Sequence, residues 1–369
     1  MGQKFTKKLV MENGHSFLGY AFGAHKDTVC EVVFNTAMVG YQEAISDPSS
    51  TNHAIVMTYP LIGNYGINDE DYESKFPSAG ALIVREYNDF PSNFRYTHTL
   101  SDYLEENGIV GISGLDTRKI ARIIRDEGTQ RVMLTDADTP DEKALDIIRS
   151  TPVPTDLVKR VSCKKRWYSR TANFRFNVVA VDCGIKLNIV RMLNRKGCNV
   201  TIVPYDTAAE EILRLCPDGV LISNGPGNPA DVPEVISLIS KLCGKLPIFG
   251  ICLGYQLACL AYGASVYKMK FGHHGANHPV KCVDTGKIEI TSQFHFYAVD
   301  EKSLEGTGLR AIYTNVLDNT VEGVESLDKS VLAVQFHPEG APGPQDSEYL
   351  FDRFLKMMDK GVTLNAEKK

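Results

Sequence analysis

A cysteine between two glycines is the residue of this sequence best placed to do chemistry. In FGICLGYQLA an apolar run ends at Gly250, Cys252 follows, and Gly254 opens a helical pattern. Glycines permit a tight turn, and a thiol at a helix N-terminus faces unpaired N–H groups that favour its thiolate. We predict a nucleophile elbow with Cys252 as nucleophile and the N–H of Leu253 as an oxyanion donor. The alternative is a cysteine buried in a sheet core.

A candidate base follows another apolar run, VLAVQF. His337 stands at the end of that run, with Glu339 two residues later. An imidazole can accept a thiol proton, and a neighbouring carboxylate can fix its tautomer. A histidine beside a glutamate is also typical of a plain surface pair. The joint occurrence with the cysteine turn therefore carries the prediction that His337 is the base and Glu339 orients it.

The elements that must position these residues begin at residue 176, where strand and helix patterns alternate strictly. NVVAVDCG is typical of a buried parallel strand and IKLNIVRMLNRKG of an amphipathic helix, and the alternation continues to YQLACLAYGA. It predicts an α/β fold: a doubly wound, mostly parallel sheet with helices on both faces. Ligands bind beyond the carboxyl ends of such strands, so the loops after LISN, FG and AVQF should gather at one edge.

Composition divides the chain into parts. Residues 1–150 mix strand signals, such as EVVFNTAMVG and HAIVMTYPLIG, with a helical pattern in TRKIARIIRDEG, and they predict a mixed β/α domain. Residues 151–175 are basic, with no acidic residue from Leu157 to Arg175, and we interpret them as a linker. Residues 176–369 form the alternating domain.

A glycine loop, SNGPGNP at residues 223–229, ends one of the predicted strands. It lacks the Lys-Ser/Thr pair of a P-loop. Gly225 and Gly227 can expose backbone N–H and C=O groups to a small polar ligand. A plain turn is the alternative at this loop.

The histidines of FGHHGANHP are candidates for a metal site. His274 and His278 have a spacing that suits a metal on a helix, but Gly275 and Pro279 disfavour a helix. No acidic or cysteine ligand lies nearby in the sequence. We therefore expect no metal site and no cofactor in this chain.

Composition also excludes several classes of partner. The chain has 369 residues, enough for two domains, with 43% hydrophobic and 23% charged residues. A net charge of −5 gives no reason to expect a nucleic acid or an anionic membrane as partner. No run approaches the roughly 18 apolar residues of a membrane helix. The nine cysteines lack CxxC spacing and indicate reduced thiols in the cytoplasm.

Together, GICLGYQ, SNGPGNP and HPE resemble the class I, or triad, glutamine amidotransferases. The rest of the chain looks like the small, glutamine-hydrolysing chain of carbamoyl phosphate synthetase. The segments that carry this resemblance are FNTAMVGYQEAISDPSS, MTYPLIGNYGIND, SNFR, GLDTRKIARIIRDEG, YKMKFGHHGANHPVK and APGPQDS. The resemblance covers essentially the whole chain.

The resemblance implies a reaction. Cys252 would attack the side-chain amide of glutamine, His337 would carry the proton, Glu339 would orient His337, and water would hydrolyse the glutamyl thioester. Ammonia would pass through a tunnel to a large synthetase chain that uses ATP, magnesium and bicarbonate. The product would serve arginine or pyrimidine biosynthesis, and the chain would work in a hetero-oligomer.

The resemblance also implies the residues that contact glutamine. The family's glutamine-contacting serine falls on Ser49 in ISDPSS, so the N-terminal domain, which would also contact the large chain, would complete the site. The other expected contacts are Gly225, Gly227, Leu253, Gln256, Phe294, Phe296 and Tyr297.

The segment TSQFHFYAVD departs from the family pattern. Phe294 stands where the family has asparagine and Phe296 where it has glycine or serine, while His295 matches. Main-chain contacts survive such substitutions, but an added phenylalanine costs about 1–3 kcal/mol where no space exists, or fills the glutamine pocket. Tyr255 replaces a usual histidine and keeps a polar tip, so we expect little effect there. We expect retained chemistry with altered glutamine binding.

Two other functions remain open from the sequence. Because of Phe294 and Phe296, the chain is alternatively a regulatory or structural subunit that activates the synthetase but hydrolyses glutamine poorly. A third reading is an amidotransferase for another acceptor, such as an anthranilate-type synthase, and the N-terminal half counts against it.

Overall fold

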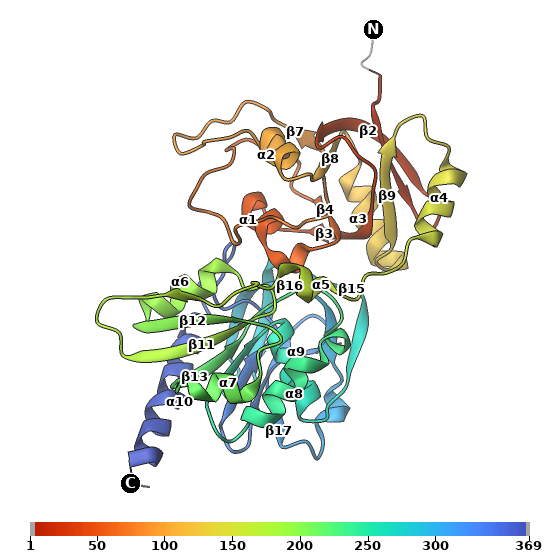
Figure 1. Ribbon diagram of the computed structural model, residues 1–369. Coiled ribbons are helices and arrows are strands. Elements are labelled where there is room, and N and C mark those ends of the chain that lie inside the picture. Colours follow the sequence, from red (N-terminus) through yellow and green to blue (C-terminus); the bar gives the residue numbers. More distant parts are fainter. Residues whose placement is uncertain (1–3, 367–369) are drawn as a thin grey trace. The chain divides into compact units, whose positions relative to one another are not determined.

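The chain forms two compact units, Met1–Pro154 and Thr155–Lys369, and the computed structural model describes residues 4–366 of it (Figure 1). Each unit has its own principal sheet. The two units are described separately below.

The first unit is built around a closed barrel with the strand order β1-β2-β8-β6-β4-β3-β9. Strands β3, β4, β6 and β8 pair in parallel, whereas β1 pairs antiparallel with both β2 and β9, so the barrel contains both kinds of pairing. The barrel strands are β1 (Lys7–Met11), β2 (Ser16–Gly23), β3 (Thr28–Asn35), β4 (His53–Met57), β6 (Ala81–Ile83), β8 (Val110–Ser113) and β9 (Arg131–Asp136).

Short helices and a two-stranded sheet surround the barrel. They are α1 (Tyr41–Ser46), η1 (Pro48–Ser50), α2 (Leu100–Glu106), α3 (Thr117–Glu127), α4 (Asp141–Ser150), and the strands β5 (Leu61–Ile62) and β7 (Glu86–Tyr87). Helix α3 forms where the isoleucine spacing predicts it. The carboxylate of Asp116 accepts a hydrogen bond from the N–H of Lys119, Ile120 and Ile124 are buried, and Gly128 follows the last turn.

The second unit holds one long sheet with the order β10-β12-β11-β13-β14-β19-β18-β16-β15-β17. Its strands are β10 (Trp167–Ser169), β11 (Phe176–Asp182), β12 (Cys198–Pro204), β13 (Gly219–Ile222), β14 (Ile248–Ile251), β15 (Val266–Cys282), β16 (Ile288–Val299), β17 (Leu309–Asn315), β18 (Val321–Ser326) and β19 (Val331–Val334). Strands β12, β11, β13, β14 and β19 pair in parallel, as the alternating pattern predicts.

The remaining strands of this sheet pair antiparallel, which the sequence reasoning did not anticipate. Beyond β19, strands β18, β16, β15 and β17 continue the sheet, and β10 lies antiparallel at the opposite edge. The whole sheet is therefore mixed. Strand β15 was not predicted, because polar and histidine-rich residues interrupt its apolar pattern.

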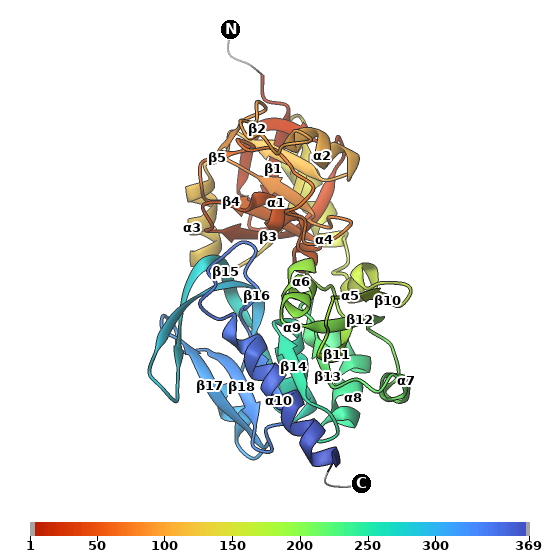
Figure 2. The same ribbon diagram turned by 90° about the vertical axis from the view of Figure 1, so that its left-hand side faces the viewer.

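Helices cover both faces of the parallel strands. Val179 and Val181 of β11 share a core with α8 (Pro233–Leu242) and α9 (Leu253–Ala261), whereas Val178 and Ala180 share a second core with α6 (Leu187–Arg195) and α10 (Tyr349–Ala366). In Figure 2, α10 lies across the face of the sheet turned toward the viewer. Alternation along one strand thus builds two cores. Shorter helices are α5 (Leu157–Val161), α7 (Ala209–Arg214), η2 (Pro229–Asp231) and η3 (Glu301–Leu304).

Residues 151–175, which we interpreted as a basic linker, contain regular structure. The helix α5 and the strand β10 lie within this range, and the second unit begins at Thr155. Trp167 pairs with Ile202 of β12 and packs against the core of the second unit. A three-residue edge strand is too short to leave a periodic pattern in the sequence.

Among the described residues, no helix combines the length and the apolarity needed to cross a membrane.

Candidate active site

Cys252 lies where strand β14 turns sharply into helix α9. Its φ of 54° and ψ of −104° lie outside the regions that side chains favour, which costs on the order of 1–3 kcal/mol. The N–H of Cys252 donates to the carbonyl oxygen of Val334 at 2.8 Å and ties the turn to β19. The strained turn holds the thiol at the N-terminus of α9, which is the geometry of a nucleophile elbow.

The glycines beside Cys252 are required by space. A Cβ on Gly254 would lie 2.2 Å from the carbonyl oxygen of Ile222, and a Cβ on Gly250 would lie 2.7 Å from the carbonyl oxygen of Gly254. The N–H of Gly254 also donates to the carbonyl oxygen of Ser223 at 3.1 Å. Only glycine therefore lets α9 begin this close to the ends of β13 and β14.

The loop 223–229 packs directly against this turn. A Cβ on Gly225 would lie 2.1 Å from the carbonyl oxygen of Cys183 and 3.0 Å from Cδ2 of Leu253. Gly227 has a φ of 93°, in the left-handed region that favours glycine. The loop, predicted to contact a small polar ligand, and Leu253, the predicted oxyanion donor at the start of α9, are therefore neighbours.

His337 and Glu339 follow the end of β19 and are buried. Nδ1 of His337 lies 2.7 Å from Oε1 of Glu339. Burial lowers the pKa of His337, but the charge of Glu339 and a hydrogen bond with Cys252 outweigh it and raise that pKa to about 10. These interactions favour the protonated form of His337, next to Sγ of Cys252. The structure thus brings together the three residues predicted to form the triad.

Lys186, which sequence reasoning missed, pairs with Glu339. Its Nζ lies 3.0 Å from Oε1 of Glu339 and donates to the carbonyl oxygen of Gly340 at 2.5 Å. Burial raises the pKa of Glu339, but the charges of Lys186 and His337 outweigh this and hold it at about 2. The buried carboxylate is therefore ionised and lies between two cations.

Further polar residues support the triad and were not predicted. Nδ2 of Asn188 donates to the carbonyl oxygen of Glu339 at 2.6 Å, and Nε2 of Gln335 lies 3.7 Å from Sγ of Cys252. A signal for Lys186 and Asn188 was present in the sequence. The segment DCGIKLN follows the end of β11 just as the other site loops follow their strands.

Strand β16 runs beside both the thiol and the imidazole. The carbonyl oxygen of Phe294 lies 3.6 Å from Sγ of Cys252, and the carbonyl oxygen of Ser292 accepts a hydrogen bond from the N–H of His337 at 2.9 Å. Both contacts use the main chain of β16. The segment TSQFHFYAVD is therefore a wall of this site as well as a buried strand.

The side chains of Phe294 and Phe296 form an aromatic cluster with His274 of β15. The centroid of the His274 ring lies 4.8 Å from that of Phe294 and 4.5 Å from that of Phe296. Both phenylalanines are more than nine-tenths buried, at 8% and 9% exposed. Their rings thus have defined packing partners, which the sequence did not predict.

Gln256 connects helix α9 to two strands. Its Nε2 donates to the carbonyl oxygen of Tyr297 at 3.0 Å and to Oε1 of Gln335 at 2.9 Å. Tyr255, beside it, is fully buried and donates its hydroxyl proton to the carbonyl oxygen of Val321 at 2.9 Å. The polar tip of the substituted tyrosine is therefore satisfied within the fold.

Ser49 belongs to the other unit and lies in η1. Its N–H donates to Oδ1 of Asp47 at 2.8 Å. Its contact with glutamine stays a prediction. The second unit contains all the other residues that were predicted for the site: Gly225, Gly227, Cys252, Leu253, Gln256, Phe294, Phe296, Tyr297, His337 and Glu339.

Removing the lysine charge should destabilise the second unit. We expect Lys186→Met to reduce the free energy of unfolding by about 3–5 kcal/mol, because it leaves the buried carboxylate of Glu339 without its lysine partner. The matched control is Lys196→Met, which breaks a more exposed pair with Asp352 and should cost at most about 1 kcal/mol. Urea denaturation of both variants at neutral pH measures the difference.

The effect of Lys186→Met should depend on pH. The pKa of Glu339 in the folded chain, about 2, lies below its ordinary value of 4.5, so its ionised form stabilises the fold above pH 4.5 and this stabilisation is lost as the pH falls toward 2. The stability difference between wild type and Lys186→Met should therefore narrow below pH 4.5. A difference that stays constant would show that the lysine stabilises something other than this carboxylate.

Two families match the chain. Residues 179–357 match the family described as glutamine amidotransferase class-I, and residues 9–134 match the family described as carbamoyl-phosphate synthase small chain, CPSase domain. The first match contains the whole turn at Cys252, the loop 223–229 and the pair His337 and Glu339. The second lies within the barrel unit.

Curated relatives match over nearly the whole chain. The carbamoyl phosphate synthase small chain of Listeria innocua is 50% identical over 355 residues, covering 96% of this chain and 97% of that protein. The protein of the same name from Staphylococcus saprophyticus is 49% identical over 362 residues, covering 97% of this chain and 98% of that protein. A third, from Oceanobacillus iheyensis, is 48% identical over 352 residues, covering 95% and 96%.

Proposed function

The chain belongs to the carbamoyl phosphate synthase small-chain family, with a class-I glutamine amidotransferase domain, and we propose that it hydrolyses glutamine through a thioester on Cys252. The observation that carries this proposal is the buried arrangement of Cys252, His337 and Glu339 at one edge of the sheet. A cysteine sulfur beside an imidazole that holds its proton, with a carboxylate that orients the imidazole, is the arrangement that nucleophilic cysteine chemistry needs.

The reaction has two halves. At the start His337 holds the thiol proton, and Sγ of Cys252, as a thiolate, attacks the side-chain carbonyl carbon of glutamine. His337 then gives that proton to the amide nitrogen, the C–N bond breaks, and ammonia leaves a glutamyl thioester. In the second half, a water molecule loses a proton to His337 and attacks the thioester. The C–S bond breaks, the proton returns to sulfur, and glutamate is released.

The oxyanion of each tetrahedral intermediate needs preorganised donors. The N–H of Leu253, at the positive end of α9, and the backbone of loop 223–229 are the proposed donors. Their proximity supports this assignment, since one small anion can reach both. Glutamine itself would be held by Gln256 and by residues 294–297 of β16, with Ser49 contributed by the barrel unit.

We further propose that the ammonia feeds a large synthetase chain. The relatives are named small chains, and the barrel unit matches the small-chain family. The large chain would supply ATP, magnesium and bicarbonate chemistry for carbamoyl phosphate synthesis, in the arginine or pyrimidine pathway. Passage through a tunnel has a chemical reason: free ammonia is protonated at neutral pH, and ammonium is not a nucleophile. The nine free cysteines support a reducing, cytoplasmic location.

The experiment compares nitrogen sources. The chain is mixed with its large chain, and carbamoyl phosphate and glutamate are measured with glutamine or with ammonium as the nitrogen donor. We expect both donors to support synthesis, with one glutamate formed for each carbamoyl phosphate made from glutamine. Synthesis from ammonium alone would contradict the proposal and favour a regulatory or structural subunit whose aromatic cluster at Phe294 and Phe296 impairs glutamine binding.

A further inference from the structure

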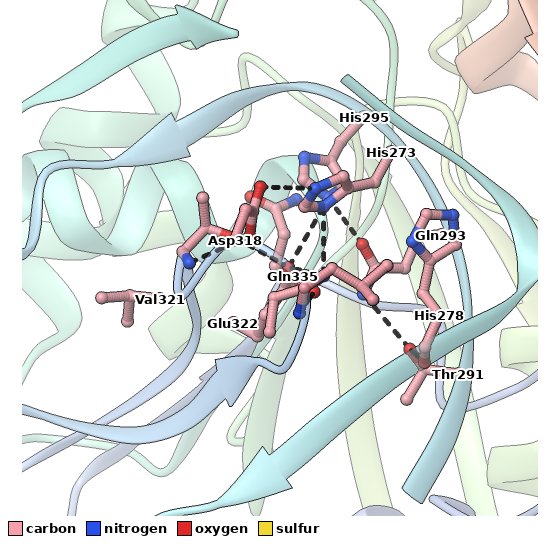
Figure 3. Close-up of polar contacts among 12 residues, drawn as sticks. His273, His278, Thr291, Gln293, His295, Asp318, Val321, Glu322 and Gln335 are labelled. Atoms are coloured by element: carbon pink, nitrogen blue, oxygen red, sulfur yellow. Dashed lines mark hydrogen bonds and ion pairs between the residues drawn. The ribbon is translucent and has the colours of Figure 1, made fainter. Parts of the chain in front are cut away.

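Three buried side chains from three neighbouring strands meet outside the triad. His273 comes from β15, His295 from β16 and Glu322 from β18, and their potential ligand atoms all lie within 4.8 Å of one another. His273 and His295 are direct partners in the β15–β16 register, with ring centroids 5.0 Å apart. Figure 3 shows this histidine–glutamate cluster with its polar neighbours.

One buried carboxylate oxygen of the cluster has no hydrogen-bond donor among the described residues. Glu322 is fully buried, and its Oε2 has no hydrogen-bond partner among the described residues, while Oε1 accepts from Nδ2 of Asn315 at 3.2 Å. Nδ1 of His278, whose ring centroid lies 5.1 Å from that of His273, is also a buried nitrogen without a hydrogen-bond partner in the described part of the chain. Buried polar atoms without partners are rare and costly, and bound ions are one of their explanations.

The hydrogen-bond contacts of His295 also indicate a cation site in this cluster. Its Nδ1 lies 2.9 Å from the carbonyl oxygen of Tyr297, and its Nε2 lies 3.0 Å from Oε1 of Gln293. A neutral imidazole has a single N–H. One N–H cannot serve two acceptor oxygens.

The orientation of Gln293 is determined by its other contact. Its Nε2 donates to Oγ1 of Thr291 at 3.2 Å, and the hydroxyl proton of Thr291 is already donated to the carbonyl oxygen of His278 at 2.9 Å (Figure 3). Exchanging the amide oxygen and nitrogen of Gln293 would place its oxygen against Oγ1 of Thr291, and neither atom would then have a proton to donate. Gln293 therefore presents its oxygen to Nε2 of His295, which carries a lone pair in a neutral ring whose N–H points to Tyr297. A cation between them removes this conflict.

We propose that His273, His295 and Glu322 bind one divalent transition-metal ion of the zinc class. Two imidazoles and a carboxylate are a common ligand set for zinc, and the oxygen of Gln293 or a water would complete the coordination. Metal–ligand bonds of about 2.0–2.2 Å require the three atoms to draw together by on the order of 1 Å.

The outer contacts of the two histidines fit this assignment. Histidine ligands of metals commonly donate their second N–H to a carboxylate or a backbone carbonyl. Nε2 of His273 lies 2.9 Å from Oδ2 of Asp318, and Nδ1 of His295 faces the carbonyl oxygen of Tyr297 at 2.9 Å. Each ring thus has one nitrogen held from outside and one turned toward the cluster.

The proposed ion would brace a wall of the active site. The carbonyl oxygen of Tyr297 that holds His295 also accepts from Gln256, Gln256 bonds Gln335, and Gln335 reaches Sγ of Cys252. A continuous set of hydrogen bonds therefore links the cluster to the nucleophile. We assign the ion a structural role there and no part in the bond-breaking steps.

Without a metal, the cluster has another way to balance charge. His273 lies 2.9 Å from Asp318 and 3.3 Å from Glu322, and although burial lowers its pKa, these two carboxylates raise it to about 9. An imidazolium between two carboxylates is then the resident cation. The two arrangements differ in one measurable property, the metal content of the protein.

The test measures metal binding by the full-length chain. The protein is stripped with a chelator, incubated with Zn²⁺ or Co²⁺, desalted and analysed by mass spectrometry for metal content and by visible absorption for cobalt. We expect about one equivalent in wild type and in the control His98→Gln, which removes a surface histidine of the barrel unit. Glu322→Gln should weaken binding at least about tenfold. A wild-type chain that takes up no metal, or a Glu322→Gln variant that binds as tightly, overturns the proposal.

A second variant guards against misfolding of Glu322→Gln. Asp318 is 39% exposed, so Asp318→Asn should fold, and loss of its charge behind His273 should weaken metal binding by about 10–100-fold. Added Zn²⁺ should raise the melting temperature of wild type more than that of Asp318→Asn. Equal shifts in the two proteins contradict the assignment. Because none of these readouts uses glutamine, their failure is distinct from a failure of the proposed glutaminase activity.

Discussion

Replacing Cys252 with serine is expected to lower glutamine-dependent carbamoyl phosphate synthesis by at least about 10³-fold, because the chemistry passes through a covalent bond to sulfur. Ammonium-dependent synthesis by the complex with the large chain should stay within about twofold of wild type, since that route needs no thioester. Serine is close to cysteine in size, so the strained turn before α9 should persist. Initial rates with each nitrogen source measure the two activities.

The control for this substitution is Cys216→Ser, which changes an exposed cysteine far from the elbow in sequence. It should leave both activities unchanged. If Cys252→Ser abolishes synthesis from ammonium as well as from glutamine, Cys252 is a structural residue and the proposed chemistry is wrong. If it leaves glutamine-dependent synthesis intact, another residue is the nucleophile.

Restoring the small residue of the family at position 296 is expected to have two large effects. Phe296→Ser should lower the KM for glutamine about tenfold, a gain of about 1.4 kcal/mol in binding, by removing a ring beside the proposed glutamine wall. It should also reduce the free energy of unfolding by about 3–5 kcal/mol, because it leaves a cavity beside His274 and Phe294. Glutaminase kinetics and urea denaturation measure the two effects.

A matched control separates the two consequences of removing a ring. Phe354 of α10 is fully buried against Phe249, in the core between α10 and the sheet. Phe354→Ser should lower stability by a similar amount, about 3–5 kcal/mol, without changing the KM for glutamine. Phe294→Asn, made separately, tests the other substitution. An unchanged KM in both Phe294→Asn and Phe296→Ser would show that neither ring limits glutamine binding.

Much of the parallel half of the second unit was predictable from the sequence. Each strand there is a short apolar run, and each is followed by a helix with its own periodic stripe, so local pattern and tertiary structure agree. The antiparallel half was not predictable in the same way. The long strand β15 carries histidines, lysines and glycines, and it becomes a strand through its pairing with β16 and β17.

The residues of the candidate site also differ in how far local sequence pattern predicts them. Cys252 and His337 stood out because each follows the end of an apolar strand, and parallel strands bring those ends to one edge. Lys186 stands at such a strand end too, but an isolated lysine carries no signal of burial. Its ion pair with Glu339 depends on how the fold places β11 beside the residues that follow β19.

By itself, the sequence determined the turn at the nucleophile, the alternation of strands and helices along the chain, and the residue types of the triad. These features depend on neighbours in the chain. Gly250 and Gly254 around Cys252 are an example. Only the tertiary structure decided which distant side chains meet: Lys186 with Glu339, the two phenylalanines with His274, and the histidine–glutamate cluster. Such contacts depend on strand order and register, and a shift of register by one residue would turn His295 to the face that carries Phe294 and Phe296.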